Sequence, residues 1–204
     1  MQKVKEKLSA IVNRVKAIVF KPKETWPVIA TEEVTIMGLG KQYLLILAAV
    51  PSIAALIGNW IVGYYNPFIH TIRLSFFESL LTAILQYILL VIGIWGTGMI
   101  ISLLAPTFGS TRDDLKGFKV AVFTYTPVLA AGILLIIPSL SPLVGLIGLY
   151  GFYLLYIGLP VVMGTPKEKS LAYIAVIVIV VILIFIIIST VTNAVLRIFG
   201  PSIL

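Results

Sequence analysis

The sequence predicts an all-α fold: a polytopic membrane protein with a bundle of five transmembrane helices and an amphipathic helix at its N-terminus. Of its 204 residues, 60% are hydrophobic and 11% are charged, whereas soluble domains carry about 25% charged residues. Five apolar runs each come close to the roughly 20 residues that a helix needs to cross a bilayer core. The charges gather in the short segments between these runs, as expected for loops at a membrane surface.

Residues 1–42 are predicted to form a basic, cytoplasmic amphipathic segment ahead of the first span. Between residues 3 and 19, apolar side chains recur at the spacing of one helical face: Val4, Leu8, Ile11, Val12, Val15, Ile18 and Val19. Lysines, Asn13 and Arg14 occupy most of the other positions. Such a helix beside membrane spans either lies on the lipid surface or packs on the inner face of the protein itself.

The stretch from Phe20 to Thr31 is predicted to interrupt the helices, because prolines at positions 22 and 27 flank Trp26. Trp26 is expected to anchor the chain at the membrane interface. The next helix is predicted to start at Thr31, since two glutamates follow it and acidic residues stabilise the first turn of a helix. Gly38–Lys41 is interpreted as a hinge before the first span.

The five spans are expected at residues 43–62, 79–104, 120–137, 143–163 and 171–192, within one membrane domain of residues 43–195. From Val120 to Pro166 there are 47 residues without a formal charge. As a single helix this run would be about 70 Å long, more than twice a hydrocarbon core of about 30 Å. It must therefore fold back, and the proline-rich segment 138–142 is the turn signal. The fifth span is apolar all round and is expected to face lipid.

The segments between the spans are interpreted from their composition. Residues 63–77 form an aromatic outer loop, in which an interfacial salt bridge between His70 and Glu78 is favoured over a functional pair. Residues 105–119 form a charged inner loop. In the second span, small residues predict the close approach of another helix; these are Gly93, Gly96 and Gly98.

The charge distribution predicts the orientation in the cell membrane. With the N-terminus inside, the inner segments hold 8 + 3 + 2 = 13 Lys and Arg residues, and the outer segments hold only Arg73 and Arg197. The positive-inside rule therefore predicts a cytoplasmic N-terminus and a C-terminus outside, with residues 196–204 as a short outer tail. We expect the basic inner face to contact the lipid bilayer and anionic lipid headgroups, and we expect no nucleic-acid partner.

Catalytic chemistry finds no support in the residues. One histidine and no cysteine exclude a Cys-ligated or multi-His metal site. The G-x-S-x-G, H-E-x-x-H and G-x-x-x-x-G-K-[ST] motifs do not occur. No Asp, Glu, Lys or Arg falls at the middle of a span, where ion-coupled carriers place charged residues. We therefore expect no catalytic, cofactor-binding or metal-binding residues.

An aromatic row is the main candidate for a ligand site. Tyr150, Tyr153 and Tyr156 recur every three residues beside glycines, and they could line a lipid groove or form a helix-packing seam. Prolines in spans three and four could kink both helices and open a cavity. The candidate lipid- or partner-binding residues are Trp26, Tyr125, Pro127, Tyr153, Tyr156 and Pro160.

The last two spans resemble those of Yip1-domain membrane proteins. The matching positions are Tyr153, Leu154, Tyr156, Gly158, Pro160, Met163, Thr165, Pro166, Glu168, Lys169 and Tyr173. The segment Pro22–Trp26 is similar to the P-x-x-x-W segment of prokaryotic members. In place of the eukaryotic G-Y-x-x-x-P motif, the chain has Thr124 and a shorter gap between Tyr125 and Pro127. Eukaryotic members bind prenylated Rab GTPases. Because the chain departs from the eukaryotic motif, the resemblance implies the five-span fold of the prokaryotic members and not this activity.

The resemblance and the missing catalytic groups together suggest a function. We expect a non-enzymatic membrane adaptor or organiser of Yip1 type, acting through its basic cytoplasmic face, with a membrane protein or a second copy of itself as possible partner. The alternative is a small permease or lipid-handling protein. That alternative requires a cavity between spans three and four, lined by Tyr125, Tyr153 and Tyr156.

Overall fold

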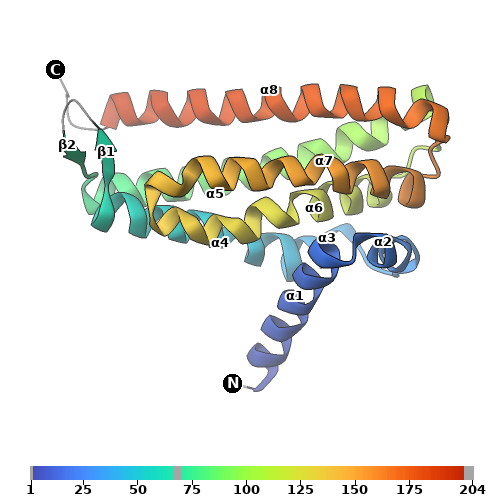
Figure 1. Cartoon of the computed structure of the whole chain (residues 1–204), viewed down its shortest axis with the longest axis horizontal. Helices are drawn as coiled ribbons and strands as arrows, with labels where there is room; N and C mark the ends of the chain where they lie inside the picture. Colours follow the sequence, from blue (N-terminus) through green and yellow to red (C-terminus); the bar gives the residue numbers. More distant parts are fainter. Residues whose placement is uncertain (1, 67–69, 200–204) are drawn as a thin grey trace.

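The computed structural model describes the backbone of residues 2–66 and 70–199. It describes their side chains except those of 3–4, 64–66, 70–72 and 195–199. Five helices in this part of the chain are long and apolar enough to cross a membrane. They lie lengthwise beside one another (Figure 1). The predicted all-helical, polytopic fold is therefore confirmed.

Each predicted span overlaps one helical segment, and every segment begins three to seven residues earlier than predicted. The first is continuous through α3 (Ile36–Leu39), η1 (Gly40–Leu44), α4 (Leu45–Ile57) and η2 (Gly58–Val62). The second is α5 (Phe76–Leu104) with η3 (Ala105–Phe108), and the third is α6 (Asp114–Ala131) with η4 (Gly132–Ile136). The fourth joins η5 (Pro138–Leu140) to α7 (Ser141–Met163), and the fifth is α8 (Lys167–Phe199).

A small hairpin lies at one end of the bundle. Strands β1 (Tyr64–Asn66) and β2 (His70–Ile72) pair antiparallel, with Tyr64 opposite Ile72. We call this the hairpin end. The opposite end carries the segments 30–41, 109–119 and 164–169, and we call it the basic end. The predicted salt bridge between His70 and Glu78 involves the His70 side chain, which lies outside the described residues. The Glu78 carboxylate accepts from the backbone N–H of Ser75 at 2.7 Å.

The N-terminal region differs from the prediction after its first helix. Helix α1 (Gln2–Phe20) agrees with the predicted amphipathic helix, but the predicted break from Phe20 to Thr31 is wrong, because Pro22–Thr31 forms helix α2. Pro22 occupies the first helical position, where a missing N–H costs nothing. The Thr31 hydroxyl donates back to the Pro27 carbonyl at 3.2 Å, within α2. Thr31 therefore ends a helix and does not begin one.

The first and third spans start earlier than predicted, without the predicted hinge before the first and with a shorter loop before the third. The Thr35 hydroxyl accepts from the Gly38 N–H at 2.9 Å and caps α3, so the predicted hinge at Gly38–Lys41 is wrong. Helix α6 begins at Asp114, because the Asp113 side chain accepts from the Lys116 N–H at 3.0 Å. The predicted loop 105–119 is consequently much shorter, while the fold-back at 138–142 is confirmed.

Glycines set the closest helix contacts in the bundle. A Cβ on Gly117 would lie 2.5 Å from the Gly98 carbonyl oxygen, so α5 and α6 cross backbone to backbone. A Cβ on Gly151 would lie 3.0 Å from the Thr124 carbonyl oxygen, so α6 and α7 are also in direct contact. These crossings fix the third span at the centre of the bundle.

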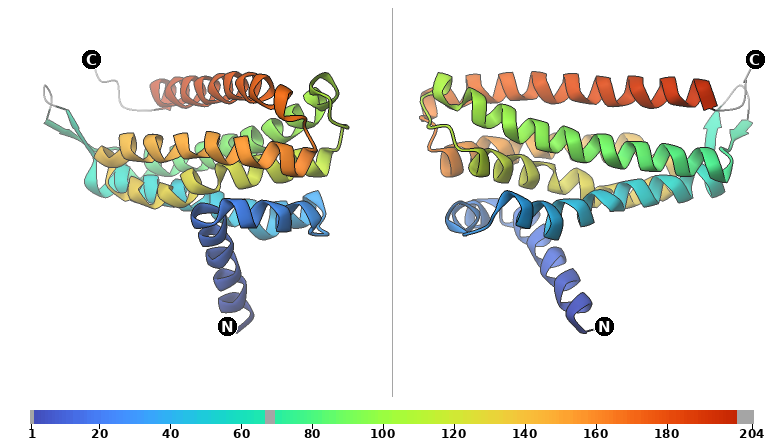
Figure 2. Two further views of the ribbon diagram at one scale, coloured as in Figure 1. Left: turned by 45° about the vertical axis from the view of Figure 1, so that its right-hand side comes forward. Right: turned by 180° about the vertical axis from the view of Figure 1, so that it is seen from behind.

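Helix α8 lies on the outside of the bundle, as Figures 1 and 2 show. Only a few of its residues are buried, which fits the prediction that the fifth span faces lipid. Its basic end is fastened by Tyr173, which is fully buried, stacks on Phe108 with ring centroids 4.5 Å apart, and donates its hydroxyl to the Ile101 carbonyl.

Candidate functional site at the basic end

Helix α2 is held against the fourth span by Trp26. The Trp26 side chain is fully buried, and its indole lies against Gly158, where a Cβ would come within 2.5 Å of the ring. Its edge meets the Phe123 ring at a centroid distance of 6.3 Å. Trp26 therefore belongs to the protein core, and its prediction as an anchor at the membrane interface is wrong. The position of Trp26 is decided by its packing against other helices, and the neighbouring prolines do not predict that packing.

Lys119 fastens the other end of α2. Its side chain is only 3% exposed, and its ammonium group donates to the carbonyls of Ile29 at 2.9 Å and Glu32 at 2.7 Å. The last carbonyls of a helix lack partners within the helix and carry partial negative charge, so a cation is favourable there. Sequence reasoning placed Lys119 in a solvated loop. Its position directly before the long uncharged run was the available signal.

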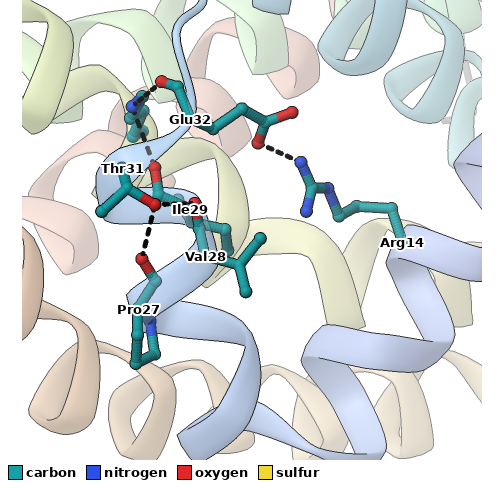
Figure 3. A network of polar contacts seen from close by, with 7 residues as sticks. Arg14, Pro27, Val28, Ile29, Thr31 and Glu32 are labelled. Carbon is teal, nitrogen blue, oxygen red and sulfur yellow. Dashed lines mark hydrogen bonds and ion pairs between the residues drawn. The ribbon is translucent and has the colours of Figure 1, made fainter.

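Arg14 of α1 joins the same network. Figure 3 shows its guanidinium paired with the Glu32 carboxylate. The Arg14 guanidinium also lies 5.4 Å from the centroid of the Phe123 ring, in cation–π geometry. Glu32 thus contacts α1 through its side chain and α6 through its backbone carbonyl. The network links the first helix, the end of α2 and the third span.

The sequence leaves two alternatives open for α1, and its second half follows the one in which the helix packs on the protein. In its second half, Ile11 and Ile18 are buried, and the Tyr150 hydroxyl donates to the Val19 carbonyl at 2.8 Å. This half packs on the protein itself. In its first half, every described side chain from residue 5 to residue 10 is exposed.

An open hollow lies between the segment after α2 and the first turns of α6. Its volume is about 530 Å³. Its lining includes both signs of charge: Glu32, Glu33, Asp113, Lys116 and Lys119. Lys116 lies 3.7 Å from Asp113, while the Glu33 side chain is exposed. Ala30, Val34 and Leu115 also line it, so the hollow suits a peptide segment that carries charges of both signs beside apolar side chains. A second hollow of similar volume, between α4 and η4, is lined by aliphatic residues and alanine alone.

The three predicted tyrosines do not line one cavity. Tyr125 is half-buried, with its hydroxyl 3.4 Å from the Thr97 hydroxyl of α5, whereas Tyr153 and Tyr156 are exposed on the outside of α7. Because α6 and α7 touch at Gly151, the predicted cavity lined by these three tyrosines is wrong. Of the two prolines, the one at position 127 is buried in α6 and the one at position 160 is half-buried in α7.

The described residues contain no group of three His, Asp or Glu side chains placed to hold a metal ion. The polar groups of the basic end are instead joined to one another. The family model of the Yip1 domain matches residues 16–189, which include all of α2, the first four spans and most of the fifth. The chain belongs to the Yip1-domain family.

Two relatives of this Yip1-domain protein come from Escherichia coli. The chain is 28% identical over 155 residues to "Inner membrane protein YohC" of strain K12 and, to the same extent, to the protein of that name from strain O6:H1. The match covers 74% of this chain and 80% of either relative. No solved structure matches the chain. The Yip1-domain protein is accordingly a multi-pass membrane protein, and Trp26, Lys119 and the hollow all lie within its family domain.

We expect the substitution Lys119→Met to destabilise this Yip1-domain protein. It removes the donor for the Ile29 and Glu32 carbonyls, while the Arg14–Glu32 ion pair does not involve Lys119 and stays in place. Leaving buried polar groups unsatisfied costs about 1–3 kcal/mol. Thermal unfolding of the purified protein in detergent measures the loss. Lys116→Met is the matched control, since Lys116 is about half-exposed, and an equal loss for both variants would contradict the role of Lys119.

Proposed function

We propose that this protein is a non-enzymatic membrane adaptor or organiser of Yip1 type that works through its basic end, with that end in the cytoplasm. One observation carries the proposal. The basic end presents a hollow of about 530 Å³ lined by carboxylates and lysines, and the outer surface of the spans is otherwise mainly apolar. A partner segment with charges of both signs would complement the hollow.

The lining of the hollow is held in place from the interior, which supports a docking role. Glu32 is joined to Arg14 and Lys119, and Asp113 caps α6. Binding to such a preorganised surface loses less side-chain entropy than binding to free surface residues. The cytoplasmic orientation is supported by the 13 Lys and Arg residues in the segments assigned to that side, against two in the others. The non-enzymatic part of the proposal is supported by the missing catalytic motifs.

Single cysteines test the orientation and the adaptor role, because the chain contains no cysteine of its own. Glu33→Cys, in the hollow, should react with a membrane-impermeant maleimide only after cells are opened. Arg73→Cys, at the hairpin end, should react in intact cells. A photo-activated cross-linker on Glu33→Cys should then capture a discrete membrane or cytoplasmic protein in native membranes, and the same cross-linker on Arg73→Cys should not.

The capture must also depend on charge. Lys116→Glu reverses one charge of the lining and should abolish it, whereas Lys167→Glu, outside the hollow, should leave it intact. Labelling of residue 33 in intact cells would refute the orientation. Identical capture from the two ends, or capture that survives Lys116→Glu, would refute the adaptor role of the hollow.

A further inference from the structure

The first half of α1 extends away from the bundle. In Figure 1 and in both views of Figure 2, α1 points away from the side of the bundle and crosses the direction of the spans obliquely. Its second half is packed through Ile11, Ile18 and the contact of Val19 with Tyr150. The first half is therefore a rigid continuation of an anchored helix. Residues 2–15 also precede the region matched by the Yip1-domain family, so this feature lies outside the shared domain.

Helix α1 leaves the bundle at the depth where the spans reach water. Lys41 in the first span and Lys119 in the third are the charges nearest to the apolar middle of those helices. Charged side chains avoid the hydrocarbon core, so the exposed Lys41 marks its boundary. Arg14 of α1 lies over Phe123, about one helical turn from Lys119. A helix that is attached at this depth and crosses the direction of the spans can lie along the boundary.

The exposed surface of the arm has the chemistry of that boundary. Leu8 and Val12 are 56% and 44% exposed and stand one turn apart on one face. At 3.6 residues per turn, Lys5 and Lys16 border this face on one side and Lys7 lies beyond it on the other. All three lysines are exposed. Lysines beside an apolar stripe are typical of helices that lie in an anionic lipid interface.

We propose that α1 is an interfacial helix that lies flat in the leaflet at the basic end. Leu8 and Val12 enter the acyl region, and Lys5, Lys7 and Lys16 bind anionic phosphate headgroups. The helix binds the leaflet beside the hollow. Arg14 and Glu32 connect it to Lys119 of the third span. This inference goes beyond the adaptor role and does not depend on it.

Nitroxide labels on single cysteines test the proposal in the full chain, reconstituted in vesicles of phosphatidylcholine with and without phosphatidylglycerol. Leu8→Cys and Val12→Cys report on the apolar face. Glu6→Cys and Ala10→Cys, also exposed and one turn apart on the opposite side, are the matched controls. With phosphatidylglycerol present, labels at 8 and 12 should collide several-fold more with oxygen than with a water-soluble nickel complex. Labels at 6 and 10 should show the reverse.

The charge requirement has its own control. Replacing Lys5, Lys7 and Lys16 together by glutamine should remove the effect of phosphatidylglycerol on labels 8 and 12. Replacing Lys167 and Lys169 by glutamine should preserve it. Equal water contact at all four label positions would overturn the proposal, as would protection of positions 8 and 12 from both reagents, which indicates packing against protein. Neither outcome bears on the cross-linking at residue 33, so the two proposals fail separately.

Discussion

Purified Gly98→Ala protein is expected to unfold at a clearly lower temperature than the unaltered chain. A Cβ at this position would lie 2.8 Å from the Cα and 3.2 Å from the backbone nitrogen of Phe118. Backbone atoms cannot rotate away, so α5 and α6 must move apart along their crossing. Overpacking of this kind costs about 1–3 kcal/mol. The cost should exceed the gain of up to about 1 kcal/mol that alanine brings over glycine within a helix.

Gly96→Ala separates these two effects on the same helix. No atom of another element lies within 4 Å of a Cβ at Gly96, so only the gain in helix propensity remains and its unfolding temperature should stay level or rise. Thermal unfolding of the three proteins in one detergent gives the comparison. If Gly98→Ala proves as stable as Gly96→Ala, the close crossing of α5 and α6 is not as the structure describes.

The same pair of glycines shows what the sequence can and cannot predict. A run of about 20 apolar residues is a property of the segment itself, so five spans and the turn at 138–142 follow from the sequence. Which glycine meets a neighbouring helix depends on the neighbour's position. Gly93 faces Ile184 of α8, Gly98 faces α6 and Gly96 faces no other helix, although all three fit the same small-residue pattern.

The candidate site was less accessible to prediction, because its contacts join distant parts of the chain. Lys119 is separated from Glu32 by 87 positions and from Ile29 by 90. Arg14 and Glu32 are 18 positions apart, with the whole of α2 between them. No periodicity or local motif encodes such pairs. Trp26 was misplaced for the same reason. Proline and tryptophan near a membrane span are typical of an interface, and only the structure shows that Gly158 on another helix leaves room for the indole.

Trp26→Ala is expected to release α2 from the bundle and to cause the largest loss of stability considered for this protein. The side chain is fully buried, and its slot exists because position 158 has no Cβ. Removing a buried tryptophan side chain costs about 3–5 kcal/mol. Hydrogen exchange should show the loss most strongly over residues 22–31, because the indole is the largest fully buried side chain of α2. Exchange in α7 should change much less.

Two control variants make this result specific. Trp95→Ala removes the same side chain from a site that is 49% exposed on α5, and it should leave exchange in α2 unchanged. Gly158→Ala should destabilise the unaltered protein, since its methyl group meets the indole at 2.5 Å, but it should cost less in the Trp26→Ala background, where it fills part of the cavity. Contacting residues couple in this non-additive way. Additive losses, or equal exchange of α2 in the Trp26 and Trp95 variants, would show that α2 is held by something other than the Trp26–Gly158 contact.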